Sequence, residues 1–307
     1  MAPLSDGQVL ATAICAGVGC FLSILGSSCI VYSIVSKRKY NRDPYHRLLL
    51  GMSVMDVIHS FWFAIGPVLV PKDSSQRSIA LGSTATCSAS GFFAQFGISV
   101  FLYSAMLSIY YVLTIRYSVT KSHMIRREKI MHCVAIFYPL LTAFSGLPLG
   151  LYNEIDIGLG CWINDFPDEC TVIGRGACVR GYNAYIYGYF FSLIPAVMSF
   201  LVVLFSNVLI FLRARHVEHA NRRFAAVPAR QRAVARTNAI ATQAFLYVLA
   251  FCNSLFWFAA LRIFDSLDQG IRDNESSVFW LILLGSFLYT CQGIFSTLIM
   301  WAHMMCK

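Results

Sequence analysis

The segment from Cys87 to Arg116 constrains the fold of this chain most, because it carries no formal charge before its last residue. It is longer than the ~20 apolar residues that a helix needs to cross a bilayer. We therefore predict a membrane-spanning helix here. Two similar apolar segments precede it and four follow, which makes it the third of seven predicted spans. The spans are expected at about 9–35, 47–70, 86–115, 130–151, 182–212, 237–261 and 276–302.

The composition agrees with a membrane protein, since 57% of the 307 residues are hydrophobic and only 13% are charged. Such a chain is too apolar for a soluble domain. No polar segment between the spans exceeds about 30 residues, fewer than the ~40 that an independent domain needs. We predict an all-α membrane protein with one seven-transmembrane helix bundle over residues 1–307. Lys307 follows the last span closely, so we expect a cytoplasmic tail to be absent or truncated.

The basic residues account for the net charge of +9 and predict the orientation in the membrane. Arginine and lysine concentrate in the first, second and third loops on one side of the spans, whereas the loops on the other side carry most of the acids. Positive loops normally face the cytoplasm, which places the N-terminus outside and the C-terminus inside. The charge then needs no nucleic-acid partner, and we expect a multi-pass protein of the plasma membrane. The basic residues of the first two inner loops are Lys37, Arg38, Lys39, Arg42, Arg47, Arg116, Lys121, Arg126, Arg127 and Lys129.

Asp56 is the one acid that lies inside a predicted span. A carboxylate at that depth costs about 2.5 to 3.5 kcal/mol, so its side chain is expected to face the bundle interior or a hydrated cavity, in contact with span seven or span three. Two roles stay equally open for it: a structural hydrogen-bond hub, or a switch or ion site. His59 lies one helical turn further along, where a lone histidine is interpreted as a core residue and not as a metal ligand. No metal site is predicted.

Four of the eleven cysteines, Cys87, Cys161, Cys170 and Cys178, lie on the predicted outer side, which is the oxidising side. Four cysteines allow three pairings, and the sequence does not decide among them. We favour Cys87 with Cys161, and Cys170 with Cys178 in a small local loop.

The third inner loop, from Arg213 to Arg236, is rich in arginine. It can lie against anionic lipid as a solvated basic loop, or it can form a docking surface for a cytoplasmic partner. We favour docking. The arginines expected to contact that partner are Arg213, Arg230, Arg232 and Arg236.

Several short motifs resemble those of G-protein-coupled receptors. A cysteine opens span three, and a Cys-Trp pair (Cys161 and Trp162) lies in the second outer loop. The segment 292–295, Gln-Gly-Ile-Phe, is similar to the Gln-Gly-x-Phe element of the secretin, adhesion and cyclic-AMP-receptor-like families. The starts of spans two and three, segments 47–56 and 87–93, resemble those of the cyclic-AMP-receptor-like group. No large extracellular domain accompanies them.

This resemblance implies a receptor, and not an enzyme, that senses a small extracellular ligand and activates a heterotrimeric G protein without a cofactor. The alternatives are a seven-helix transporter, which would show internal repeats, and a metal-dependent membrane hydrolase, which needs histidines and carboxylates at one depth. We see neither feature in the sequence. Residues expected to bind the ligand are Phe92, Gln95, Trp162, Tyr185, Tyr189 and Trp257. Residues expected to form the switch are Asp56, Tyr111, Arg116, Gln292 and Gly293.

Overall fold

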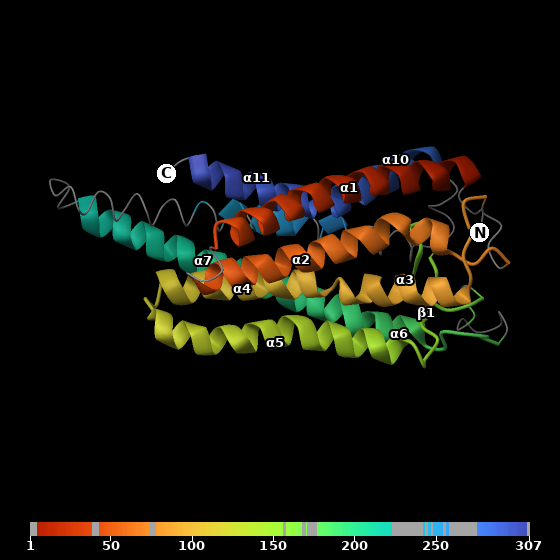
Figure 1. Ribbon diagram of the computed structural model, residues 1–307, viewed down its shortest axis with the longest axis horizontal. Coiled ribbons are helices and arrows are strands. Elements are labelled where there is room, and N and C mark those ends of the chain that lie inside the picture. The colour runs from red at the N-terminus through yellow and green to blue at the C-terminus, as the bar shows by residue number, and fades with distance from the viewer. Residues whose placement is uncertain are drawn as a thin grey trace.

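The computed structural model is an elongated helical bundle whose long helices run roughly along one axis (Figure 1). The start of α1 and a small β-hairpin lie at one end of this bundle, and the C-terminal ends of α7 and α11 lie at the other. We call these the hairpin end, which is the predicted outer end, and the opposite end. The structure describes residues 5–38, 43–73, 78–155, 158–167, 170, 177–222, 242, 245–246, 248–253, 256–257 and 275–305.

The secondary structure is almost entirely helical. The α-helices are α1 (Asp6–Ser36), α2 (Pro44–Ile65), α3 (Thr84–Phe96), α4 (Ser99–Ile115), α5 (Lys121–Gly146), α6 (Ala184–Gly188), α7 (Ile194–Arg222), α10 (Glu275–Thr290) and α11 (Gln292–Met305). A 3₁₀ helix, η2 (Gly66–Leu69), extends α2. A π-helical turn, η3 (Tyr189–Leu193), joins α6 to α7. The two strands are β1 (Tyr152–Glu154) and β2 (Cys161–Ile163).

The prediction of an all-α membrane bundle is confirmed. Five helices in the described part of the chain are long and apolar enough to cross a membrane, and α10 with α11 makes a sixth if this bent pair is one span. Predicted span six lies largely outside the described residues, and those of its residues that are described, within 242–257, are helical. Large apolar side chains such as Phe21, Phe137 and Phe205 are exposed on the helices, as hydrocarbon surroundings require.

Several helices extend beyond the predicted spans or are interrupted within them, because hydropathy detects where a helix enters lipid and not where it begins or breaks. The fourth span starts at Lys121, so Glu128 and Lys129 are helical, and Pro139 lies inside the unbroken α5. The fifth span continues to Arg222. Span three is interrupted at 97–98 between α3 and α4. Span seven is bent by 49° between α10 and α11, near Cys291.

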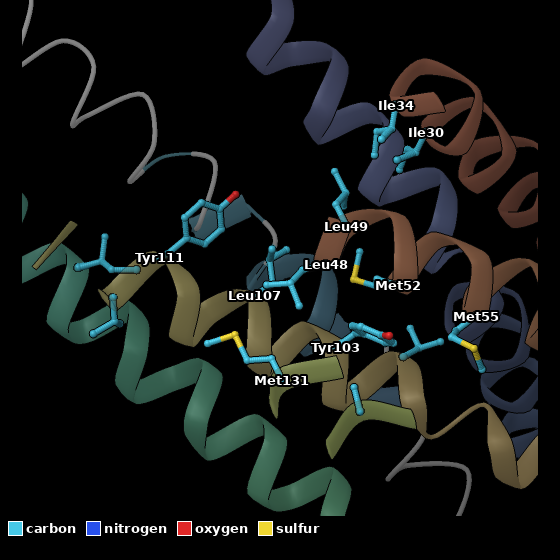
Figure 2. Packing of buried hydrophobic residues seen from close by; sticks show 14 residues of the cluster. Ile30, Ile34, Leu48, Leu49, Met52, Met55, Tyr103, Leu107, Tyr111 and Met131 are labelled. Carbon is cyan, nitrogen blue, oxygen red and sulfur yellow. The ribbon is translucent and has the colours of Figure 1, made fainter. Parts of the chain in front are cut away.

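The largest hydrophobic cluster joins α1, α2, α4 and α5 toward the opposite end of the bundle. Figure 2 shows side chains of α2 and α4 meeting in this cluster, with Tyr103 of α4 at its centre. Tyr103 is 1% exposed. Its ring fills the place that a side chain at Gly51 would take, because a Cβ there would lie 2.8 Å from the ring. The cluster thereby fixes the relative positions of the second, third and fourth spans.

The β-hairpin is tied to the start of α3. Strands β1 and β2 are antiparallel, with Asn153 opposite Trp162. Cys87 of α3 is bonded to Cys161 of β2, and Cys170 is bonded to Cys178, so both favoured pairings are confirmed. Tyr152 anchors the other strand by donating a hydrogen bond of 2.7 Å to the carbonyl of Ala143 in α5. These contacts hold the hairpin over the end of the bundle.

Candidate functional site

Asp56 lies at the junction of α1, α2 and α11 and is 5% exposed. Its Oδ2 atom accepts hydrogen bonds from the hydroxyls of Ser23, at 2.9 Å, and Ser27, at 2.7 Å. The Ser23 hydroxyl also accepts a hydrogen bond of 2.7 Å from the backbone N–H of Gly293. The side chain therefore faces inward as predicted. The predicted contact with span seven is made at Gly293, whereas the hydrogen bonds from span one were not predicted: both donors to the carboxylate, Ser23 and Ser27, belong to α1.

The bend near Cys291 is what brings span seven to Asp56. A helix that begins at Gln292 leaves the N–H groups of its first turn without partners inside the helix, and Gly293 uses one of them for Ser23. The N-terminal end of α11, which carries the positive end of the helix dipole, then lies beside the carboxyl group of Asp56. Gly293 has no room for a side chain, because a Cβ would lie 2.3 Å from Asp56 Oδ2. The Gln-Gly-x-Phe motif thus places its glycine at the buried acid.

Replacing Gly293 by alanine is expected to destabilise the protein by about 1 to 3 kcal/mol, because the new methyl group overpacks the junction and separates α11 from Ser23. The control is Gly17→Ala in α1, where an added Cβ meets nothing within 4 Å. That change should be neutral or stabilise the helix. Thermal unfolding of both variants in detergent tests this, and equal melting temperatures would contradict the close packing.

Two small cavities lie along the bundle axis next to this junction. The first has a volume of about 20 Å³ and is lined by Asp56, His59, Tyr289, Thr290 and Gln292, among others. The second, also about 20 Å³, is lined by Ser108, Tyr111, Gln292 and Ser296, among others. Each has room for one water-sized species. Gln292 borders both, so polar groups continue from the acid toward the opposite end.

Gln95 forms a second hub, nearer the hairpin end, and is fully buried. Its Oε1 atom accepts hydrogen bonds from the indole N–H of Trp162, at 3.0 Å, and from Ser192, at 2.9 Å. Its amide nitrogen donates to the hydroxyl of Thr142 and to the carbonyl of Phe191, both at 3.0 Å. These four bonds use the whole capacity of the amide. Gln95 therefore connects α3, α5, the hairpin and the π-helical turn η3.

Gln95, Trp162 and Phe92 are the ligand-site residues that the structure brings together, since Phe92 and Trp162 both pack on the hydrophobic cluster beneath the hairpin. Tyr185 and Tyr189 do not join them. They are 59% and 52% exposed on the outer surface of the fifth span, which suits contact with lipid headgroups. Trp257 lies apart from the Gln95 hub in the described contacts and has Phe256 as its ring neighbour.

The predicted switch residues divide in a similar way. Asp56, Gln292 and Gly293 meet at one junction, and Tyr111 lines the second cavity. Arg116 is exposed at the end of α4, with its guanidinium 5.9 Å from the ring of Tyr117. Of the predicted G-protein contacts, Arg213 lies in α7, and the other three lie outside the described residues: Arg230, Arg232 and Arg236.

Sequence reasoning missed an ion-pair network toward the opposite end. Arg47 of α2 binds Glu128 of α5 through two nitrogens, at 2.5 and 2.6 Å. His132 Nε2 lies 3.6 Å from Glu128, and His132 Nδ1 lies 2.9 Å from the hydroxyl of Tyr103. Asp56 is therefore not the one acid within the helices. The spacing of Glu128 and His132, one helical turn, was the available signal, but the predicted span began after Glu128.

The described residues contain one cluster of side chains of the metal-ligating type, Asp165, Cys170 and Cys178. The two cysteines are bonded to each other and offer no thiolates. This cluster therefore does not suit a metal ion.

No protein-family model matches the chain, and no curated protein matches it. Solved structures do match. The crystal structure of squid rhodopsin has a TM-score of 0.70 and 15% sequence identity, with 97% of this chain and 78% of that one covered. At this identity the likeness concerns the fold alone. The chain has the helical membrane fold seen in squid rhodopsin, a G-protein-coupled receptor, and it carries the two polar hubs within that fold.

Proposed function

We propose that the chain is a G-protein-coupled receptor of the plasma membrane, with its N-terminus outside, that senses a small extracellular ligand and activates a heterotrimeric G protein. The observation that carries this proposal is the line of polar groups along the bundle axis. One part of it, Gln95 with Trp162, lies under the hairpin, and the other part, Asp56 with Gln292, borders the two cavities, the second of which reaches Tyr111. A ligand that prefers one arrangement of these groups shifts the equilibrium at the opposite end.

The helices that meet along this line are interrupted where they touch it. The break between α3 and α4 follows Gln95, the π-helical turn contacts Gln95 through Ser192, and the bend in span seven precedes Gln292. Breaks and π-helical turns are common at functional sites, where helices change their relative positions. This supports a relay between the two ends of the bundle. The Gln-Gly-x-Phe motif supports the cyclic-AMP-receptor-like or secretin-adhesion-like branch for this receptor.

We assign the G-protein contact to Arg213 and to the three further arginines expected from the sequence, Arg230, Arg232 and Arg236. The helix α7 extends to Arg222 and carries Arg213 and Arg215 beyond its apolar part. Arginine binds carbonyl and carboxylate groups through a planar fork, which suits the C-terminal segment of a Gα subunit.

The experiment is nucleotide exchange on a panel of G proteins, with the full chain in membranes and a panel of small metabolites that includes cyclic AMP. At least one combination of a metabolite and a G protein should show stimulated nucleotide exchange. We expect Asp56→Asn to lower the stimulated exchange by about 5-fold or more. Loss of the acid changes the relative stability of the two helix arrangements at the α1, α2 and α11 junction. Surface expression should be nearly unchanged, because the amide oxygen still accepts from Ser23 and Ser27.

The matched control is Asp6→Asn, the same change at an exposed acid at the start of α1. It should leave both exchange and expression intact. A normal response of Asp56→Asn would remove Asp56 from the relay. Absence of exchange with every pair, together with solute uptake into proteoliposomes or metal-dependent hydrolysis, would support the transporter or the hydrolase instead.

A further inference from the structure

The side chain of Trp162 fills the hairpin end of the bundle. Neighbouring residues of a strand point to opposite faces. Cys161 and Ile163 of β2 are 3% exposed, with Cys161 bonded to α3, and Trp162 between them points the other way. Its ring packs against three separate hydrophobic clusters. Their buried members include Phe101 and Phe251 in the first, Ala16 and Ile282 in the second, and Tyr152 and Ala184 in the third.

The surroundings of this ring have the properties of a small-molecule site. The clusters that it packs against contain apolar residues of α1, α4, α10 and the hairpin, and Oε1 of Gln95 accepts a hydrogen bond from its N–H at 3.0 Å. Ligand sites typically combine apolar walls with a few placed polar groups. The two cavities along the axis each have room for only one water-sized species. Among the described residues, the indole thus occupies a space of the kind that an outer ligand needs.

We propose that the outer site binds a flat aromatic ligand with one N–H or O–H donor, which takes the place of the Trp162 indole and donates to Gln95. This inference rests on the proposed receptor function and names the class of its ligand. The hairpin is then the resident occupant of the site, and a diffusible ligand competes with it. An aromatic ring without a donor fits the apolar walls but leaves Oε1 of Gln95 with Ser192 alone.

Trp162→Ala tests the proposal by emptying the space. We expect indole at saturating concentration to raise the melting temperature of the purified variant by about 3 °C or more, since a ligand that binds only the folded state stabilises it. Wild-type protein should shift far less, because its own indole competes. The analogue 1-methylindole, which lacks the donor, should give a clearly smaller shift in Trp162→Ala than indole does.

The matched control is Trp62→Ala. Trp62 stacks on Phe93 of α3 at 4.3 Å, near the hairpin end, but no described contact joins it to Gln95. Indole and 1-methylindole should shift the melting temperature of Trp62→Ala by the same amount. Equal shifts of Trp162→Ala with both compounds, or an equal indole shift in Trp62→Ala, would overturn the proposal. The melting temperature needs no G protein, so a positive result without nucleotide exchange would refute the receptor function and leave the ligand class standing.

A second variant covers the case in which Trp162→Ala does not fold. Trp162→Phe keeps a ring and removes only the donor. We expect it and Gln95→Ala each to lower the melting temperature, and the double variant to fall by clearly less than the two losses combined, because the two residues share one hydrogen bond. Strictly additive losses would show that the indole does not bind Gln95, and would overturn the proposal.

Discussion

Replacing Arg47 by methionine is expected to destabilise the protein by about 3 to 5 kcal/mol, because it leaves the buried Glu128 carboxylate without its cation. The side chain of Glu128 is 7% exposed, whereas that of Arg47 is 31% exposed. The reverse change, Glu128→Gln, should therefore cost less, since Arg47 can turn toward water or lipid headgroups. Thermal unfolding of the purified variants measures this asymmetry.

The double variant Arg47→Met with Glu128→Leu is the control. Replacing both members of a buried ion pair by apolar residues is often nearly neutral, so the double variant should be more stable than Arg47→Met alone. A cycle of the two single changes and the double change isolates the pair. If the two single variants unfold at the same temperature, the difference in burial does not govern the pair. The prediction would then fail.

Removing the disulfide between Cys87 and Cys161 should cost about 4 kcal/mol in the chain-entropy description, because it closes a long loop. The two cysteines are separated by 74 residues. Serine at both positions avoids a new free thiol. We expect a lower melting temperature and reduced delivery to the cell surface, since the hairpin loses its covalent link to α3. Flow cytometry of an N-terminal tag and thermal unfolding measure the two effects.

The second disulfide provides the matched control. Cys170 and Cys178 are separated by only 8 residues, so removing their bond should cost about 2 kcal/mol. Cys87 and Cys161 are also buried together with Val70 and Ala80, where serine hydroxyls fit poorly. Equal losses from the two double-serine variants would contradict the special role given to the bond at α3.

The candidate site was only partly predictable. Trp162 and Gln95 were both named from the sequence, and they lie in one hydrogen-bonded group. Tyr185 and Tyr189 are exposed and lie apart from that group. A membrane helix is apolar both toward lipid and toward its neighbours, so its interior face leaves little pattern in the sequence. Glu128 was overlooked for a related reason. Its helix extends beyond the apolar segment, and hydropathy reports only the apolar part.

The sequence by itself determined the membrane class, the approximate positions of the spans, and the inward direction of Asp56, because lipid excludes charge and each span needs about 20 apolar residues. Only the tertiary structure decided which groups meet. It selected one of three cysteine pairings and placed the partners of Asp56 on span one. It also put Gly293 against the acid through a bend in span seven. These contacts depend on how the helices pack and where they break, and local hydrophobicity predicts neither the packing nor the breaks.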